Sequence, residues 1–297
     1  YLKEVPKTLK AERKEKEKEL FDAKEPIPQP TRNDLRAEAQ EVSPYLVFTI
    51  YDQSGAPVRK ITSSAKKGIN KINWDLRYHY PYPLREMNDF KPTANTRGGT
   101  LAMPGKYSVS LDLINREGVE RLVEPVEFKA KSLNLGTIQP KDRSEIVEFQ
   151  NDVIEFSRVF LGFERKVADN LSRVISMRQA ALQTPAIDYA LVQELEKMEV
   201  ELKDIQFEID GPRAKASWEE LPPMEMPLSR RLNVAVRTHW SNTTGLSKTA
   251  VRQYDILKEE FPPLVKRLKK VSVKLEQLDK QLENAGAAWT PGREIVL

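Results

Sequence analysis

Residues of the types that carry out catalysis are present in this chain, but their spacing matches no catalytic pattern. The sequence has only two histidines. Neither His79 nor His239 is followed, three or four residues later, by a second histidine or a carboxylate, as a helical metal site requires. The sequence contains no cysteine, which excludes thiol nucleophiles, thiolate metal sites and disulfides. We therefore predict neither a metal site nor a bound cofactor.

Carboxylates and glycines give no stronger catalytic signal. Asp75 could be proposed as one of the two carboxylates that glycoside hydrolysis needs about 5 to 10 Å apart. We expect it instead to cap a turn or to pair with Arg77. Glu219 and Glu220 fall in a predicted loop and are expected to be solvated. The segment 97–100 (Arg-Gly-Gly-Thr) lacks the spacing and the following helix of a phosphate-binding loop, and no Gly-x-Ser-x-Gly elbow occurs. We assign no catalytic residue.

A segment rich in tyrosine and proline, residues 78–83, is the best candidate for a binding surface. Tyrosine has an apolar ring and a polar hydroxyl, which suits it to stacking on sugars or to contact with a protein. We therefore select Tyr78, Tyr80 and Tyr82 as candidate contacts for a protein partner or a glycan. The alternative is that these rings pack the loop onto the rest of the protein, and the sequence leaves both open.

Alternating apolar and polar residues predict strands between Tyr45 and Phe128. The first strand carries Leu46, Phe48 and Ile50 on one face, and the turn at Ser54-Gly55 leads to a return strand. A third strand with a buried tryptophan is predicted over 69–76, followed by a long loop over 77–105. Two long strands, 107–113 and 119–128, complete the set. Regularly spaced short strands indicate an immunoglobulin-like antiparallel β-sandwich, placed at 43–132.

Residues 1–42 are predicted to form a helical lead-in. Lysine and glutamate alternate in its first part, which favours a solvated helix with ion pairs between successive turns. A second, short helix is expected to begin at Thr31 or Asn33, with Leu35 and Ala39 facing inward.

From residue 140 to residue 285 the apolar period becomes helical. Two long seams with alternating spacings of three and four run from Ile146 to Val174 and from Tyr254 to Leu282. We expect an antiparallel bundle within the chain, with a kink or break at Pro262-Pro263 and a C-terminal tail over 286–297. An intermolecular coiled coil is the alternative. The predicted fold class is thus α+β with several domains, an immunoglobulin-like sandwich followed by a helical bundle.

Charge and hydropathy exclude two classes of partner. The 48 basic and 44 acidic residues give a net charge of +4. They are interspersed, which argues against a nucleic-acid partner. No run of ~18 apolar residues is present to span a bilayer. The sequence begins with Tyr1 and shows no signal peptide, from which we expect a processed chain or a piece of a longer one.

The β segment resembles the immunoglobulin-like domain of flagellar hook-capping proteins and of bacterial secretion-sorting modules. The glycine that usually follows Trp-Asp in that pattern is displaced here into the long loop, as Gly98-Gly99. The matching residues are Asp52 with Gly55, Val58-Arg59, Gly68 with Trp74-Asp75, and Pro104-Gly105 with Tyr107.

A second resemblance covers most of the chain. The motifs at 2–8, 74–78, 104–107 and 290–293 are similar, in order and spacing, to the C-terminal region of large bacterial proteins with a sortilin-like BNR-repeat β-propeller. Such proteins are often labelled glycosyl hydrolases. The resemblance implies a propeller upstream of this region, which would carry any hydrolase activity. It also implies export to the periplasm, the outer membrane or the medium. The Asp-box motif of propeller blades, Ser-x-Asp-x-Gly-x-Thr-Trp, does not occur in this sequence.

These observations together predict a non-catalytic module that braces the propeller and contacts a protein partner. Two alternatives remain open. The chain could belong to a glycoside- or peptide-acting hydrolase and shape the edge of an active site upstream. It could also be a stand-alone structural adaptor of an extracytoplasmic assembly. The oligomeric state is not predicted.

Overall fold

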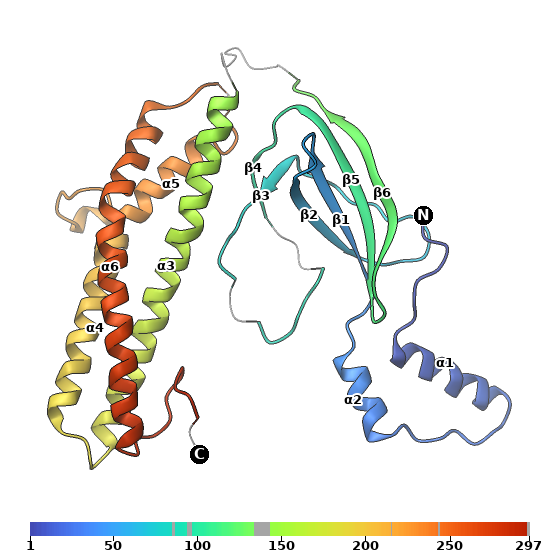
Figure 1. Ribbon diagram of the computed structural model, residues 1–297, viewed down its shortest axis with the longest axis horizontal. Helices are drawn as coiled ribbons and strands as arrows, with labels where there is room; N and C mark the ends of the chain where they lie inside the picture. Colours follow the sequence, from blue (N-terminus) through green and yellow to red (C-terminus); the bar gives the residue numbers. More distant parts are fainter. Residues whose placement is uncertain (85–86, 94–96, 134–142, 215, 243, 296–297) are drawn as a thin grey trace. The chain divides into compact units, whose positions relative to one another are not determined.

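The computed structural model describes the chain except residues 85–86, 94–96, 134–142, 215, 243 and 296–297. The chain divides into two units. The β unit is Tyr1–Tyr80 with Glu86–Leu135, and the helical unit is Pro81–Arg85 with Gly136–Leu297. Figure 1 shows the strands of the first unit, with two short helices before them, and the long helices of the second.

Four antiparallel strands form the main sheet of the β unit (Figure 1). They are β1 (Tyr45–Asp52), β2 (Pro57–Ser64), β5 (Gly105–Asn115) and β6 (Gly118–Ala130), in the order β2-β1-β5-β6. Tight turns join β1 to β2 and β5 to β6, as predicted. Each turn contains a glycine with positive φ, a conformation that side chains with a Cβ rarely adopt.

The predicted alternation along β1 is confirmed by the strand register. Leu46 lies opposite Leu113, Phe48 opposite Leu111, and Ile50 opposite Val109, so these side chains share one face. We call it the inner face, because its central side chains, such as Leu46 and Ile50, are buried. The opposite face is more polar. It carries residues such as Thr49 and Ser110.

The predicted third strand over Ile69–Leu76 is wrong. These residues do not form a strand, and Ile69 is exposed. The backbone of Leu76 has a φ of 54°, which breaks the extended conformation. The strand β3 therefore begins one residue later, at Arg77, and Trp74 is half-buried rather than buried.

The predicted long loop over 77–105 is also wrong in part. It contains β3 (Arg77–His79) and β4 (Gly98–Leu101), which pair in a separate two-stranded antiparallel sheet. Residues 80–97 connect these strands, and we call this connection the β3–β4 loop.

Two short helices precede the sheet, α1 (Leu9–Asp22) and α2 (Arg32–Gln40). The Thr31 hydroxyl accepts a hydrogen bond from the backbone N–H of Asp34, and the Asp34 carboxylate accepts one from the backbone N–H of Thr31. This capping box confirms Thr31, one of the two predicted caps of α2. The prediction that Leu35 and Ala39 face inward is wrong, because both are exposed. A short helix held by charged contacts needs no apolar stripe.

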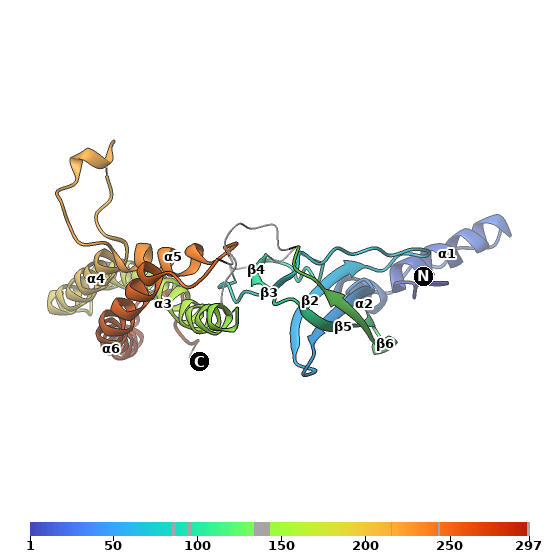
Figure 2. The ribbon, with the colours of Figure 1, turned by 90° about the horizontal axis from the view of Figure 1, so that it is seen from above.

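The helical unit contains four α-helices in its described part. They are α3 (Ser144–Gln183), α4 (Tyr189–Asp210), α5 (Leu228–Thr238) and α6 (Lys248–Asn284). A 3₁₀ turn, η1 (Trp218–Glu220), lies in the connection from α4 to α5, which projects from the helices in Figure 2. The predicted start at residue 140 falls outside the described residues. None of the helices described combines the length and apolar character needed to cross a bilayer.

The helices run up, down and up, and the descending helices are antiparallel to α3 and α6. Asn170 bonds to Ser272 and Arg173 to Asp279, so α3 and α6 run parallel. The ion pairs Arg267–Glu201 and Lys274–Glu194 show that α4 runs antiparallel to α6. The short helix α5 continues the descent of α4 and ends at His239, where Gln150 near the start of α3 binds its carbonyl. Thus α4 and α5 together occupy the place of one helix.

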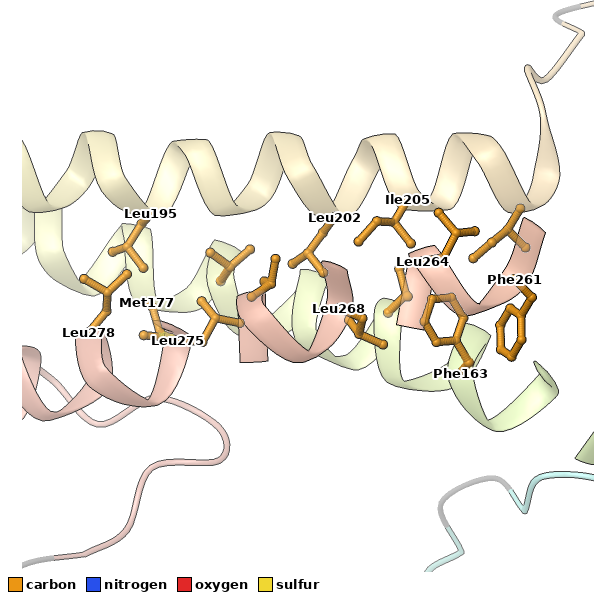
Figure 3. Packing of buried hydrophobic residues seen from close by; sticks show 14 of the residues in the cluster. Phe163, Met177, Leu195, Leu202, Ile205, Phe261, Leu264, Leu268, Leu275 and Leu278 are labelled. Atoms are coloured by element: carbon orange, nitrogen blue, oxygen red, sulfur yellow. The ribbon is translucent and has the colours of Figure 1, made fainter. Parts of the chain in front are cut away.

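The two predicted apolar seams form the core of the helical unit. In Figure 3, Leu195, Leu202 and Ile205 of α4 face Leu264, Leu268, Leu275 and Leu278 of α6. The seams are therefore buried within one chain. No break occurs at Pro262 and Pro263, since α6 continues through both. The buried neighbours Phe261 and Leu264 hold the helix there despite two missing N–H donors.

His239 links the end of α5 to the start of α6. Its side chain is buried, and its Nε2 accepts a hydrogen bond from the backbone N–H of Ser247, 3.1 Å away. The ring is therefore neutral with its proton on Nδ1. Burial lowers the pKa of His239 below its usual value of 6.5.

We predict that His239 lowers the stability of the helical unit as the pH falls from about 8 to about 5, while Glu164, whose pKa burial raises to about 7, acts in the opposite direction. Above pH 6.5 the imidazole is neutral in both states. Below 6.5 the unfolded chain takes up a proton first, so the free energy of unfolding decreases until the lower folded-state pKa is passed. Urea unfolding followed by circular dichroism should show the His239 contribution as the difference between the wild type and His239→Gln, because Glu164 contributes equally to both. His79→Gln, in the other unit, is the control. Equal slopes for the His239 variant and the wild type would contradict the assignment.

Candidate interaction surface

Large apolar side chains are exposed in the β3–β4 loop. In the part of this loop that belongs to the β unit, Met87 is 52% exposed and Phe90 is 70% exposed. A contiguous exposed apolar patch marks a surface that a partner covers, and these two side chains lie three positions apart in the loop. Phe and Met are also among the residues enriched at protein interfaces. We call Met87 and Phe90 the apolar pair.

The three tyrosines selected from the sequence have different surroundings. Tyr78 is half-buried, and Tyr80 is only 6% exposed. Tyr82 is 44% exposed and Leu84 is 85% exposed, both in the stretch that belongs to the helical unit. Burial of Tyr78 and Tyr80 favours the packing alternative for these two rings. Tyr82 is exposed enough for the contact alternative to stay open.

A buried arginine fastens the base of the β3–β4 loop. Arg59 on β2 lies opposite Ile50 on the inner face, and it is 6% exposed. Its Nη1 donates to the carbonyl of Tyr78, 3.3 Å away, and to the carbonyl of Arg97, 3.0 Å away. Tyr78 lies in β3 and Arg97 directly precedes β4, so the two carbonyls lie at the two ends of the loop. A buried guanidinium must find acceptors, because leaving its donors unpaired costs free energy. Arg59 therefore holds the two ends of the β3–β4 loop together.

Sequence reasoning used Arg59 only as part of a family motif and missed this role. A signal was present. In the strand 58–61 (Val-Arg-Lys-Ile), Arg59 and Ile61 have the same parity and point to the same face. A charged residue at an apolar-face position of a strand must reach polar groups elsewhere. Which groups it reaches depends on the folding of β3 and β4, which the local sequence does not reveal.

A short ring of hydrogen bonds fixes β3 to β5 just below the loop. The Tyr107 hydroxyl donates to the carbonyl of Met103, 2.6 Å away. The backbone N–H of Met103 donates to the Tyr78 hydroxyl oxygen, 3.1 Å away. The two hydroxyl oxygens are 3.3 Å apart, and since the Tyr107 proton is already used, Tyr78 donates to Tyr107. Burial raises the pKa of Tyr107, so its hydroxyl keeps its proton at neutral pH.

Packing among three aromatic side chains on the inner face, Trp74, Tyr107 and Phe128, supports these hydrogen bonds. Trp74 meets the edge of Tyr107 with 5.1 Å between ring centroids, and Phe128 of β6 with 5.8 Å. Its indole N–H donates to the carbonyl of Arg77, 2.9 Å away. Trp74 thereby covers part of the sheet and holds the first residue of β3. Edge-to-face pairs of this kind add stability beyond the area they bury.

Two adjacent glycines allow β4 to approach β3. A Cβ on Gly98 would lie 2.5 Å from a carboxylate oxygen of Asp75 and 2.6 Å from the Cβ of Arg77. A Cβ on Gly99 would lie 2.9 Å from the carbonyl oxygen of His79. Glycine is therefore required at both positions 98 and 99, because a Cβ at either one would overlap Asp75, Arg77 or His79. Partial burial, followed by the charge of Arg59, lowers the pKa of His79.

The carboxylates that were considered for catalysis each have a structural or solvated environment of their own. Asp75 accepts a hydrogen bond from the backbone N–H of Arg77, 3.2 Å away, which is the predicted turn cap. Glu219 and Glu220 are exposed at η1, as predicted. In the helical unit, burial and the nearby Asp210 carboxylate raise the pKa of Glu164 to about 7. Within the described ranges, no three His, Asp or Glu side chains are placed to share a metal ion.

Comparison of the chain with protein-family models, with curated proteins and with solved structures gave no match.

We predict that Gly98→Ala destabilises the β unit by about 1–3 kcal/mol, because the new methyl group overlaps Asp75 and Arg77 and forces β3 and β4 apart. Gly105→Ala is the matched control, since a Cβ there would meet no atom within 4 Å. Denaturant unfolding followed by tryptophan fluorescence measures both variants. If Gly98→Ala unfolds at the same denaturant concentration as Gly105→Ala, the close approach of the two strands is contradicted.

Proposed function

We propose that this chain is a non-catalytic interaction module and that the β3–β4 loop contacts a protein partner. The observation that carries the proposal is the exposed apolar pair, Met87 and Phe90, on a loop whose two ends are bonded to Arg59. Exposed Phe and Met side chains are of the types enriched at protein interfaces, which favours protein contact over a purely structural role.

We further propose that the β unit is an immunoglobulin-like sandwich in which the two-stranded sheet begins the second layer. The strand order β2-β1-β5-β6 is that of strands C′, C, F and G in such domains. Tyr107, near the start of β5, bonds back to the carbonyl of Met103. This contact is equivalent to the tyrosine corner found at the start of strand F. Trp74 packs against the sheet, but it lies after β2 and not on β1, the strand equivalent to the one that carries the core tryptophan of these domains.

The motifs shared with the C-terminal regions of exported sortilin-like propeller proteins support a location for this module. We propose that it follows such a propeller in a bacterial protein outside the cytoplasm. The helical unit would then brace the propeller, since its own core is already filled by its two apolar seams. Any hydrolase activity of the parent protein would belong to the propeller.

Site-specific photo-crosslinking in the cells that make the protein tests the contact role. A photoreactive phenylalanine at Phe90 or Met87 should give one discrete adduct, because these side chains lie in the contact. The same group at Lys60, an exposed position of β2, is the control and should give none. Absence of an adduct at both loop positions, or an equal yield at Lys60, would contradict the proposal.

The intact mass of the native protein tests the proposed location. The chain described here has a mass of 34.1 kDa. A native mass several times larger, with the adduct joined to upstream residues of the same polypeptide, supports a module that contacts its own propeller. A native mass near this value contradicts the propeller reading and favours the adaptor.

A further inference from the structure

We propose that α1, α2 and their connection form a strap that ionic contacts hold against the β unit and that screening of charge releases. We call Leu9–Gln40 the arm. The proposal is independent of the role of the β3–β4 loop, because it concerns other residues of the β unit.

The arm has no apolar core of its own. Neither α1 nor α2 contains a buried residue. The helices have 14 and 9 residues, and helices this short are marginally stable in water when nothing else holds them. Phe21 is exposed near the end of α1, and Leu35 is exposed on α2. Polar contacts must therefore supply most of the attachment.

One arginine connects both ends of the arm to the sheet. Arg116, in the turn between β5 and β6, donates from Nη1 and Nη2 to the two carboxylate oxygens of Glu12, at 3.1 and 2.8 Å. Its Nη1 also lies 3.9 Å from Glu41, directly after α2. The Glu41 carboxylate in turn accepts the backbone N–H of Leu9, at 2.6 Å. A single guanidinium thus holds the first turn of α1, the end of α2 and the sheet together.

A second arginine closes the arm on itself. Arg13 of α1 donates from Nε and Nη2 to the carboxylate of Glu38 on α2, at 2.5 and 2.8 Å. It also donates to Glu17, one turn further along α1. This fork holds the two helices side by side, and it leaves Arg116 as the main ionic link between the arm and the sheet.

Both ends of the arm stay attached when these contacts are lost. Before the arm, the backbones of Leu2 and Gly68 exchange two hydrogen bonds, at 2.9 and 2.8 Å. After it, the chain enters β1. The arm can therefore detach and melt without leaving the protein. Solvent-accessible ion pairs contribute little stability each and weaken as the Debye length shrinks from ~30 Å at 0.01 M salt to ~3 Å at 1 M.

Hydrogen exchange of the whole chain at about 0.01 M and about 1 M sodium chloride tests the strap. We expect amide exchange in α1 and α2 to rise about tenfold at high salt, while β5 and β6 stay protected. Arg116→Ala should give the fast exchange already at low salt. Arg121→Ala is the control, because its partners, Asp112 and Glu124, lie on the sheet. Exchange in the arm that does not respond to salt, or that rises equally in β5 and β6, would overturn the proposal.

Discussion

The organisation of the β unit depends on a guanidinium group buried on an otherwise apolar sheet face. Arg59 cannot be left without acceptors there, because burying unpaired donors costs more than a hydrogen bond returns. Its acceptors are backbone carbonyls at the two ends of the β3–β4 loop, at Tyr78 and Arg97. The free energy of burying one charge is thus coupled to the conformation of the loop. The exposed apolar pair, Met87 and Phe90, lies on the loop whose two ends are bonded to the buried Arg59.

Contacts on the inner face hold the two-stranded sheet of β3 and β4 in place, although few hydrogen bonds join its own strands. The strands β3 and β4 have three and four residues, too few for a hairpin to be stable alone. The bonded ring of Tyr78, Tyr107 and Met103 joins them to β5. Trp74 adds apolar contact and a bond to the start of β3. Polar contacts fix the position, and aromatic packing adds buried apolar surface.

The helical unit follows a simpler rule, in which apolar periodicity alone decides the packing. One seam on α3 and one on α6 meet the apolar face of α4, and the core closes within the chain. The connection from α4 to α5 interrupts the descending helix and projects from the bundle (Figure 2). Parallel α3 and α6 follow from this arrangement, since a single descending layer separates two ascending helices.

Much of this could be predicted from the sequence, and each failure has its own physical cause. The alternation along β1 and β5, the glycine turns and the helical seams depend on neighbouring residues, so local pattern is enough. The strand expected at Ile69–Leu76 failed because Leu76 adopts a positive φ and Trp74 bonds to a carbonyl three residues on. The role of Arg59 was missed because its acceptors lie far along the chain. The four helices were predicted, but their direction depends on how α4 and α5 share one layer.

The measurement that tests this account most directly is amide exchange in the β3–β4 sheet of Arg59→Met. Methionine keeps much of the length and apolar volume of arginine but removes the donors. If the guanidinium fastens the loop, exchange at the amides of β3 and β4 should rise about tenfold, while β1 and β5 stay as protected as in the wild type. Unchanged exchange in β3 and β4 would mean that the loop base is held by other contacts, which would contradict the central claim.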